Sequence, residues 1–258
     1  MTRSLAALLA VGTVLTGLGT TRAARAQDFA SEAELVEGAS NRFRSAQRFG
    51  AEVTFGPYRP NVDSEFNGKR DPYNAYFGSG NHLMMRASLE YQFWHRYGTL
   101  AAGLGAGYFT VTGTAPVADG SGLPSGDQST LKVVPFSLSA IYRFDYFLET
   151  RKIPLVPFGK LGLDYAYWSI SDGNGNIAVD STGGHARGGT PGWHVGAGLA
   201  LVIDFLDPDA AHDFDEDLGV NHTAITFEYY HADISGLGQP DRLHVGDTSW
   251  TLGLLLEF

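Results

Sequence analysis

Histidine, aspartate and serine lie close together in the segment His231-Ala-Asp233-Ile-Ser235. An imidazole beside a hydroxyl group can act as a general base toward that hydroxyl or toward water. His231 and Asp233 are alternate residues, so they would share one face of a strand. An interfacial histidine explains His231 equally well, and no second strand that we can identify completes the set. We therefore predict no catalytic residues; if the chain is an enzyme, His231, Asp233 and His194 are the residues to test.

The densest cluster of charge in the sequence includes Asp213, Asp215 and Asp217. This spacing is that of the first ligands of a calcium-binding loop. Leu218, however, stands where such a loop needs glycine, and Ala224 stands where it needs a closing glutamate. We therefore predict a solvated connection without a metal ion, in which one short helix could form.

Three glycines, Gly103, Gly105 and Gly107, superficially resemble a phosphate-binding loop. Such a loop also needs a lysine and a strand–turn–helix context, and both are missing here. Because the glycines occupy alternate positions, we predict that they face inward along a strand and leave room for large charged neighbours. No cofactor is predicted.

The composition excludes several classes of protein. The 258 residues include no cysteine, which rules out disulfides, thiolate metal sites and a catalytic thiol. Aromatic residues make up 12% and charged residues only 18% of the chain, which argues against disorder. The formal net charge of −10 argues against nucleic-acid binding.

The first 26 residues have the layout of a secretory signal peptide, with Arg3 before an apolar run over 4–18 and small residues up to Ala26. The run is short for a membrane anchor. Removing three arginines and no acidic residue changes the net charge from −10 to −13. We predict a signal peptide over 1–26, a periplasmic N-terminal tail over 27–48 and one domain over 49–258.

From Phe49 onward, apolar residues alternate with polar or small ones, which is the period of a β-strand. No later run is apolar enough for a membrane-spanning helix. The pattern predicts eight strands, over 49–57, 82–94, 99–112, 130–144, 154–170, 191–206, 221–233 and 246–258. The connections alternate between long and short, as in outer-membrane barrels with long extracellular loops and short periplasmic turns. An even number of strands places both ends of the domain on the periplasmic side.

The charged face of these strands decides between a soluble and a membrane barrel. Eight strands enclose a space that side chains can fill, and charges of both signs can pair there. An apolar exterior is stable against lipid but not in water. We therefore predict an all-β, eight-stranded antiparallel up-and-down transmembrane β-barrel; a lipocalin-like barrel or a β-sandwich is the alternative. The predicted interior charge network comprises Glu52, Arg86, Glu90, Arg143, Lys160, Asp164 and Glu228.

Two aromatic belts at the membrane surfaces are also expected. The inner belt would comprise Phe93, Trp94, Phe144, Phe205 and Phe258, and the outer belt Tyr108, Tyr167, Trp168, Trp193, Tyr229 and Trp250.

The last predicted strand looks like the signal by which barrel-assembly machinery recognises outer-membrane proteins. Its residues are Trp250, Leu252, Leu254, Leu256 and Phe258. The domain as a whole resembles small eight-stranded barrels of the OmpA transmembrane-domain and OmpX kind. Four segments, 56–65, 160–165, 219–222 and 245–250, resemble an uncharacterised outer-membrane barrel family of myxobacteria and relatives. The resemblance implies a Gram-negative outer membrane but no activity.

We therefore predict a non-enzymatic outer-membrane protein with a structural or surface-interaction role. Its partners would be outer-membrane lipid, the barrel-assembly machinery and an extracellular ligand held by the loops. The alternatives are a lipid-modifying enzyme, by acyl transfer or deacylation, and a narrow pore. Burying ions is costly unless they pair, so we expect a plugged interior, and we expect Arg86→Ala to destabilise it by leaving acids such as Glu90 unpaired.

Overall fold

The computed structural model describes residues 48–66, 69–116, 124–179, 183–239 and 242–258. The predicted signal peptide and the predicted tail up to residue 47 lie outside these ranges. The three-part domain division therefore stays a prediction.

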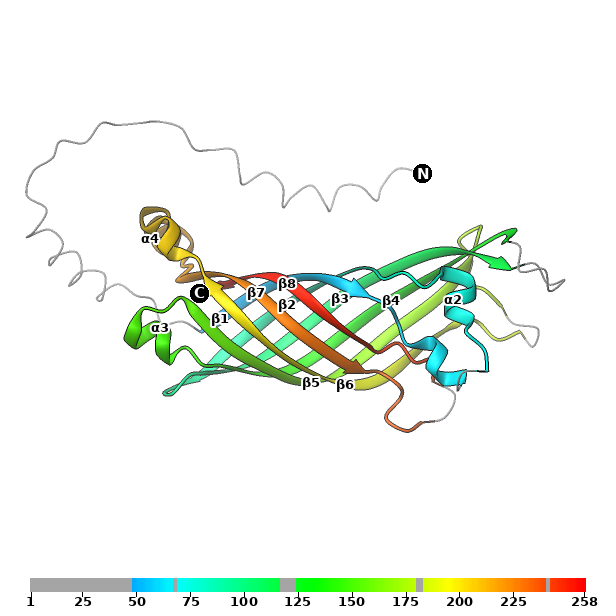
Figure 1. Ribbon diagram of the computed structural model, residues 1–258, viewed down its shortest axis with the longest axis horizontal. Helices are drawn as coiled ribbons and strands as arrows, with labels where there is room; N and C mark the ends of the chain where they lie inside the picture. Colours follow the sequence, from blue (N-terminus) through cyan, green and yellow to red (C-terminus); the bar gives the residue numbers. More distant parts are fainter. Residues whose placement is uncertain (1–47, 67–68, 117–123, 180–182, 240–241) are drawn as a thin grey trace, which may run out of the picture. The chain divides into compact units, whose positions relative to one another are not determined.

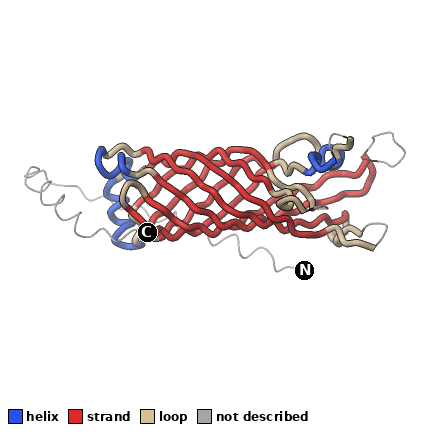
Figure 2. Tube along the Cα trace, turned by 90° about the horizontal axis from the view of Figure 1, so that it is seen from below, coloured by secondary structure: helices blue, strands red, loops and turns tan. Residues whose placement is uncertain are grey.

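Eight antiparallel strands form a closed barrel in the order β1-β2-β3-β4-β5-β6-β7-β8 (Figures 1 and 2). Each strand pairs with its neighbours in sequence, and β1 pairs with β8 from Gly50↔Glu257 to Phe55↔Leu252 to close the barrel. The strands are β1 (Phe49–Tyr58), β2 (His82–His95), β3 (Thr99–Pro116), β4 (Pro124–Arg143), β5 (Leu155–Asp172), β6 (Arg187–Val202), β7 (His222–Asp233) and β8 (Asp247–Glu257). The predicted fold class, strand number and connectivity are confirmed.

The largest difference from the predicted strand ends is in the β3–β4 hairpin. The prediction ended one strand at residue 112 and began the next at 130, because glycine, proline and serine in between suggest a loop. Pairing instead continues through Gly113↔Ser129 and Thr114↔Gln128. A hydrogen bond of 2.9 Å between the hydroxyls of Thr112 and Thr130 supports the extension on the outward side.

Short helices lie at both ends of the barrel, as Figures 1 and 2 show. One end, which we call the α2 end, carries η1 (Val62–Phe66) and α2 (Pro72–Phe77). The opposite end, which we call the α4 end, carries α3 (Tyr146–Arg151), η2 (Asp204–Leu206) and α4 (Pro208–Leu218). In the described part of the chain, no helix is both long and apolar enough to cross a membrane.

Side-chain orientation follows the alternation in the sequence. Leu104 on β3 and Leu163 on β5 face outward and are 67% and 61% exposed, whereas Glu90 on β2 faces the lumen and is 2% exposed. A strand places successive side chains on opposite faces, so the same contrast repeats around the barrel. The exterior of the middle of the barrel is therefore apolar, and its interior holds the charged residues.

Two apolar clusters fill the lumen toward its ends. The larger lies at the α2 end, where Tyr58, Phe109 and Val245 are almost fully buried and the ring of Tyr73 from α2 packs with them. The smaller, at the α4 end, includes Phe158 and Leu255. Polar and charged side chains occupy the lumen between and beside these clusters, and they form the candidate site.

Candidate functional site

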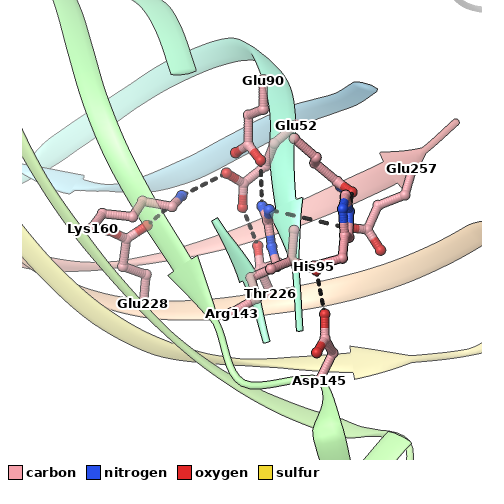
Figure 3. Close-up of polar contacts among 11 residues, drawn as sticks. Glu52, Glu90, His95, Arg143, Asp145, Lys160, Thr226, Glu228 and Glu257 are labelled. Carbon is pink, nitrogen blue, oxygen red and sulfur yellow. Dashed lines mark hydrogen bonds and ion pairs between the residues drawn. The ribbon is translucent and has the colours of Figure 1, made fainter. Parts of the chain in front are cut away.

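One lysine and two glutamates form the first ion cluster of the lumen (Figure 3). Lys160 on β5 reaches Glu52 on β1 with an Nζ–Oε2 distance of 2.6 Å and Glu228 on β7 with 3.0 Å. The other oxygen of Glu52 accepts a hydrogen bond of 2.8 Å from Thr226. The side chains therefore link three strands across the lumen.

Arg143 organises a second ion cluster nearer the α4 end. Its Nη2 lies 2.5 Å from Glu90 Oε2, and its Nη1 lies 3.9 Å from Glu257 Oε1 (Figure 3). Gln92 Nε2 donates a hydrogen bond of 2.9 Å to the same oxygen of Glu257. Since burying an isolated ion costs several kcal/mol, each of these charges needs its partner.

Arg86 also faces the lumen, but it does not pair as the sequence suggested. In the described chain, no carboxylate lies within ion-pair distance of Arg86; its guanidinium lies instead over the ring of Tyr230, 4.4 Å from the ring centroid. The expectation that removing Arg86 leaves acids such as Glu90 unpaired is therefore corrected, because Lys160 and Arg143 hold those acids. The register between the strands decides which charges meet in the lumen, and the order of charges along the sequence does not reveal this register.

A third group of polar residues forms a hydrogen-bonded chain of serine, histidine and aspartate. His194 Nδ1 lies 2.8 Å from Asp164 Oδ2, and His194 Nε2 lies 3.0 Å from Ser139 Oγ. All three come from neighbouring strands, β6, β5 and β4. Asp164 was expected in the interior charge network, where it does lie, but its contact is with His194. Ser139 was not singled out from the sequence, although its inward parity on β4 could have placed it in the lumen.

Gly162 makes the contact between Ser139 and His194 possible. In the strand register Ser139 is opposite Gly162, and Gly162 is opposite His194. A Cβ on Gly162 would overlap the His194 ring and the Leu138 carbonyl oxygen. The absence of a side chain on the middle strand thus lets the imidazole of β6 cross over β5 to β4.

A cavity of about 60 Å³ lies in the middle of the lumen beside these groups. Its lining includes Ser139, Arg86, Lys160 and Tyr230. The alternate glycines of β3 (Gly103, Gly105 and Gly107) form another wall. Gly103 and Gly107 have little free space around them, since an added Cβ would lie 3.0 Å from Ile141 Cδ1 and from Pro135 Cγ respectively. These glycines have inward positions on the strand, as expected.

The sequence candidates His231, Asp233 and Ser235 border a different, larger pocket at the α2 end. This polar pocket of about 860 Å³ lies between the β1–β2 and β7–β8 connections. His231 Nδ1 bonds the Thr248 hydroxyl at 2.7 Å, and its ring packs against Trp193. No hydrogen bond joins His231 to Asp233 or Ser235, so these described residues do not form a catalytic chain there.

Neighbouring polar groups shape the same pocket. Ser64 Oγ lies 3.0 Å from His244 Nδ1, and Asp63 accepts a hydrogen bond of 2.7 Å from the Tyr73 backbone N–H. Burial raises the pKa of the Tyr73 hydroxyl to about 12, although the Arg59 guanidinium near its ring opposes the shift. Tyr73 therefore stays protonated at neutral pH.

The acidic run that resembled a calcium loop forms most of α4 instead. The helix begins at Pro208 and ends at Leu218, and Gly219 follows with a φ of 70°. Among the described residues, no group of three or more histidine or acidic side chains is arranged to hold a metal ion.

Most of the expected belt residues with described side chains face outward, but Trp168 does not. Its side chain packs against the apolar cluster of the α2 end, and its Nε1 donates a hydrogen bond of 3.2 Å to Thr190. Trp168 has the parity of Asp164 and Ala166 along β5, so it points into the lumen. Tyr167, its neighbour, is the outward residue at this level.

No known family model matches the chain, and no curated protein matches it. The fold does match solved outer-membrane barrels. Ail of Yersinia pestis is 13% identical, with 83% of this chain and 100% of that chain covered and a TM-score of 0.42. Neisserial surface protein A is 12% identical (83% and 98% covered, TM-score 0.43), and the outer membrane enzyme PagL is 15% identical (80% and 97% covered, TM-score 0.36). The assignment as an eight-stranded antiparallel barrel rests on the closed strand pairing of the chain itself.

Proposed function

We propose that this protein is an integral outer-membrane β-barrel with a structural or surface-interaction role. The observation that carries the proposal is the orientation of the strands, which expose leucine on the outside and bury glutamate in the lumen. In water this exterior would be a large apolar patch, whereas lipid tails solvate it. A closed barrel also leaves no unpaired strand edge in the membrane.

The α2 end faces the outside of the cell in this proposal. Long outer loops and short inner turns are typical of such barrels. The longest connection, residues 59–81, joins β1 to β2 at the α2 end, and the shortest, residues 96–98, joins β2 to β3 at the α4 end. The expected alternation is not strict, since residues 203–221 at the α4 end form a longer connection than residues 117–123 at the α2 end. The pocket of about 860 Å³ then opens to the exterior, where Asn61, Asn74 and His244 can contact a polar ligand. Surface connections on a rigid scaffold are where binding functions concentrate.

The lumen supports a plugged barrel better than a pore. Lys160 and Arg143 each contact two carboxylates across the lumen, and apolar clusters lie on both sides of these ions. An open water channel is typical of barrels with about 16 or more strands.

Fractionation and conductance test the proposal together. The protein is expected in the outer-membrane fraction after an alkaline wash, and the refolded protein is expected to give no conductance steps in a planar bilayer. Recovery in the soluble fraction would contradict the membrane assignment. Regular conductance steps, absent from mock-refolded detergent, would support the pore.

Assembly through β8 follows from the same proposal. Trp250, Leu252 and Leu254 face outward on this strand, which pairs with β1 to close the barrel. We propose that the assembly machinery binds this strand before β1 does. Membership in the uncharacterised myxobacterial-type barrel family is likewise a proposal, supported by the four similar segments named above.

Among the described residues, the lipid-modifying alternative has no complete residue set at the α2 end, because His231 bonds Thr248 rather than an acidic side chain. The described histidine that does bond both a hydroxyl and a carboxylate in the barrel wall is His194, inside the lumen.

A further inference from the structure

We propose that Ser139, His194 and Asp164 form a hydrolytic triad inside the barrel that acts on short-chain carboxylic esters of about the size of an acetyl ester. The inference is independent of the surface role proposed above. It assigns a chemical activity to a luminal site rather than to the outer pocket.

The first support is the order of the hydrogen bonds. The carboxylate of Asp164 contacts Nδ1 of His194, and Nε2 of the same ring contacts the Ser139 hydroxyl, at 2.8 and 3.0 Å. This order fixes the tautomer with the proton on Nδ1, so that Nε2 can accept the serine proton. His194 is 2% and Asp164 5% exposed, so both side chains are shielded from bulk water.

The second support is that packing fixes the position of the His194 ring. Tyr230 stacks on it with a centroid distance of 5.4 Å and an interplanar angle of 27°. Gly162 leaves the space through which the imidazole reaches Ser139. A base whose position is fixed by packing meets the geometric requirement for proton transfer.

The third support is a cation in the cavity that has no carboxylate within ion-pair distance in the described chain. Arg86 lines the same cavity as Ser139 and stacks on Tyr230, and in the described chain it has no ion pair. A guanidinium in such a position can stabilise the negative charge that develops on an ester oxygen.

The reaction balances with ester and water alone. Ser139 Oγ forms a bond to the carbonyl carbon while His194 takes the hydroxyl proton, and Arg86 faces the resulting oxyanion. The bond from carbon to the alcohol oxygen then breaks, and His194 gives its proton to the leaving alcohol. Water, deprotonated by His194, attacks the acyl-serine, and the products are a carboxylic acid and free Ser139.

The size of the cavity sets the substrate class. A volume of about 60 Å³ holds about four waters, which matches an acetyl group and excludes a fatty acyl chain. The apolar cluster and the Arg143 cluster separate the cavity from the two ends of the barrel. Side chains must move to admit a substrate, so we expect slow turnover.

The test uses the full mature chain, refolded in lipid vesicles, with methanesulfonyl fluoride as a small probe. The probe forms an Oγ–sulfur bond on an activated serine and releases fluoride, and peptide mass mapping locates the adduct. We expect one adduct, on Ser139, with its rate reduced about 10²-fold in His194→Gln and Asp164→Asn. Ser129→Ala is the matched control, since Ser129 lies on the same strand but is not among the residues that line the cavity. Ser137 does line the cavity and serves only as a competing site for the label.

Hydrolysis of ethyl acetate, followed by NMR, provides the second measurement. Activity that is lost in Ser139→Ala, kept in Ser129→Ala and absent for ethyl octanoate supports the triad. A folded protein, judged by its heat-modifiable gel mobility, that gives no adduct overturns the proposal. So does labelling that is equal at Ser137, or labelling of Ser139 that His194→Gln leaves unchanged.

Discussion

Individual charges in the lumen contribute to stability through their partners. Lys160 neutralises both Glu52 and Glu228, so its removal leaves two buried carboxylates without a cation. We expect Lys160→Ala to lower the free energy of unfolding by about 3–5 kcal/mol. Urea unfolding in lipid vesicles measures the change, and Lys132→Ala, at an exposed outward position, is the control. Equal midpoints for the two variants would show that the ion cluster does not stabilise the barrel.

A substitution at Gly162 tests whether the position of the His194 ring contributes to stability. Gly162→Ala is expected to displace the His194 ring and to lower the thermal unfolding midpoint, because the added Cβ overlaps that ring and the neighbouring backbone. Gly159→Ala on the same strand has only the Gly196 carbonyl oxygen nearby, at 3.8 Å. It should therefore unfold close to the wild-type temperature, and a similar loss in both variants would argue for a general effect of glycine on β5.

At this scale the sequence predicts which side chains face inward but not which of them touch. Period-two alternation places Asp164, His194 and Lys160 in the lumen. Their partners, Ser139 and Glu52 among them, lie on other strands and are set by the register between strands. A shift by two residues would keep every orientation and change every pair.

The strands are the elements whose outer faces meet lipid. Leu252 is at the centre of β8 and faces outward, so Leu252→Arg is expected to cost about 2–4 kcal/mol in lipid. Thr110→Arg on β3 is expected to cost only about 0–1 kcal/mol, because the exposed Lys132 opposite it indicates that this level lies at the polar edge of the apolar band. Urea titrations of both refolded variants measure these costs. Equal costs would mean that the two levels of the barrel share one environment.

Helix α2 closes the α2 end of the lumen mainly through Tyr73. This ring is 1% exposed, and in the part of the chain that the structure describes its hydroxyl has no hydrogen-bond partner. Tyr73→Phe should therefore be at least as stable as the wild type, whereas Tyr73→Ala should lose about 3–5 kcal/mol of unfolding free energy. A stability loss in Tyr73→Phe, measured by urea unfolding, would reveal a role of the hydroxyl.

Element existence and order were predictable because each strand carries a clear alternation. Strand ends were less so, since Gly113 and Ser129 look like loop residues yet continue the hairpin. The acidic run illustrates a different limit. Its spacing suggested a metal loop, the departures from that pattern at Leu218 and Ala224 favoured a connection with a short helix, and the run forms most of α4.

For the molecule as a whole, closure of the barrel combines these effects. Strand pairing provides the hydrogen bonds of the backbone, charged side chains pair inside the lumen, and apolar side chains lie on the outside of the barrel. The proposed location in the outer membrane depends on this inside-out distribution. The chain has no cysteine, so single cysteines can be introduced without any background.

A scan of spin-labelled single cysteines along β5 tests this distribution most directly. In lipid vesicles, labels at Leu161, Leu163 and Tyr165 should be relaxed strongly by oxygen and weakly by a water-soluble nickel chelate. Labels at Gly159 and Leu155 should follow the same outward pattern, whereas labels at Ala166 and Val156 should be shielded from both reagents. The account predicts this period of two. The account would be contradicted if labels at Leu161 and Leu163 were shielded from oxygen while labels at Val156 and Ala166 were accessible to the nickel chelate.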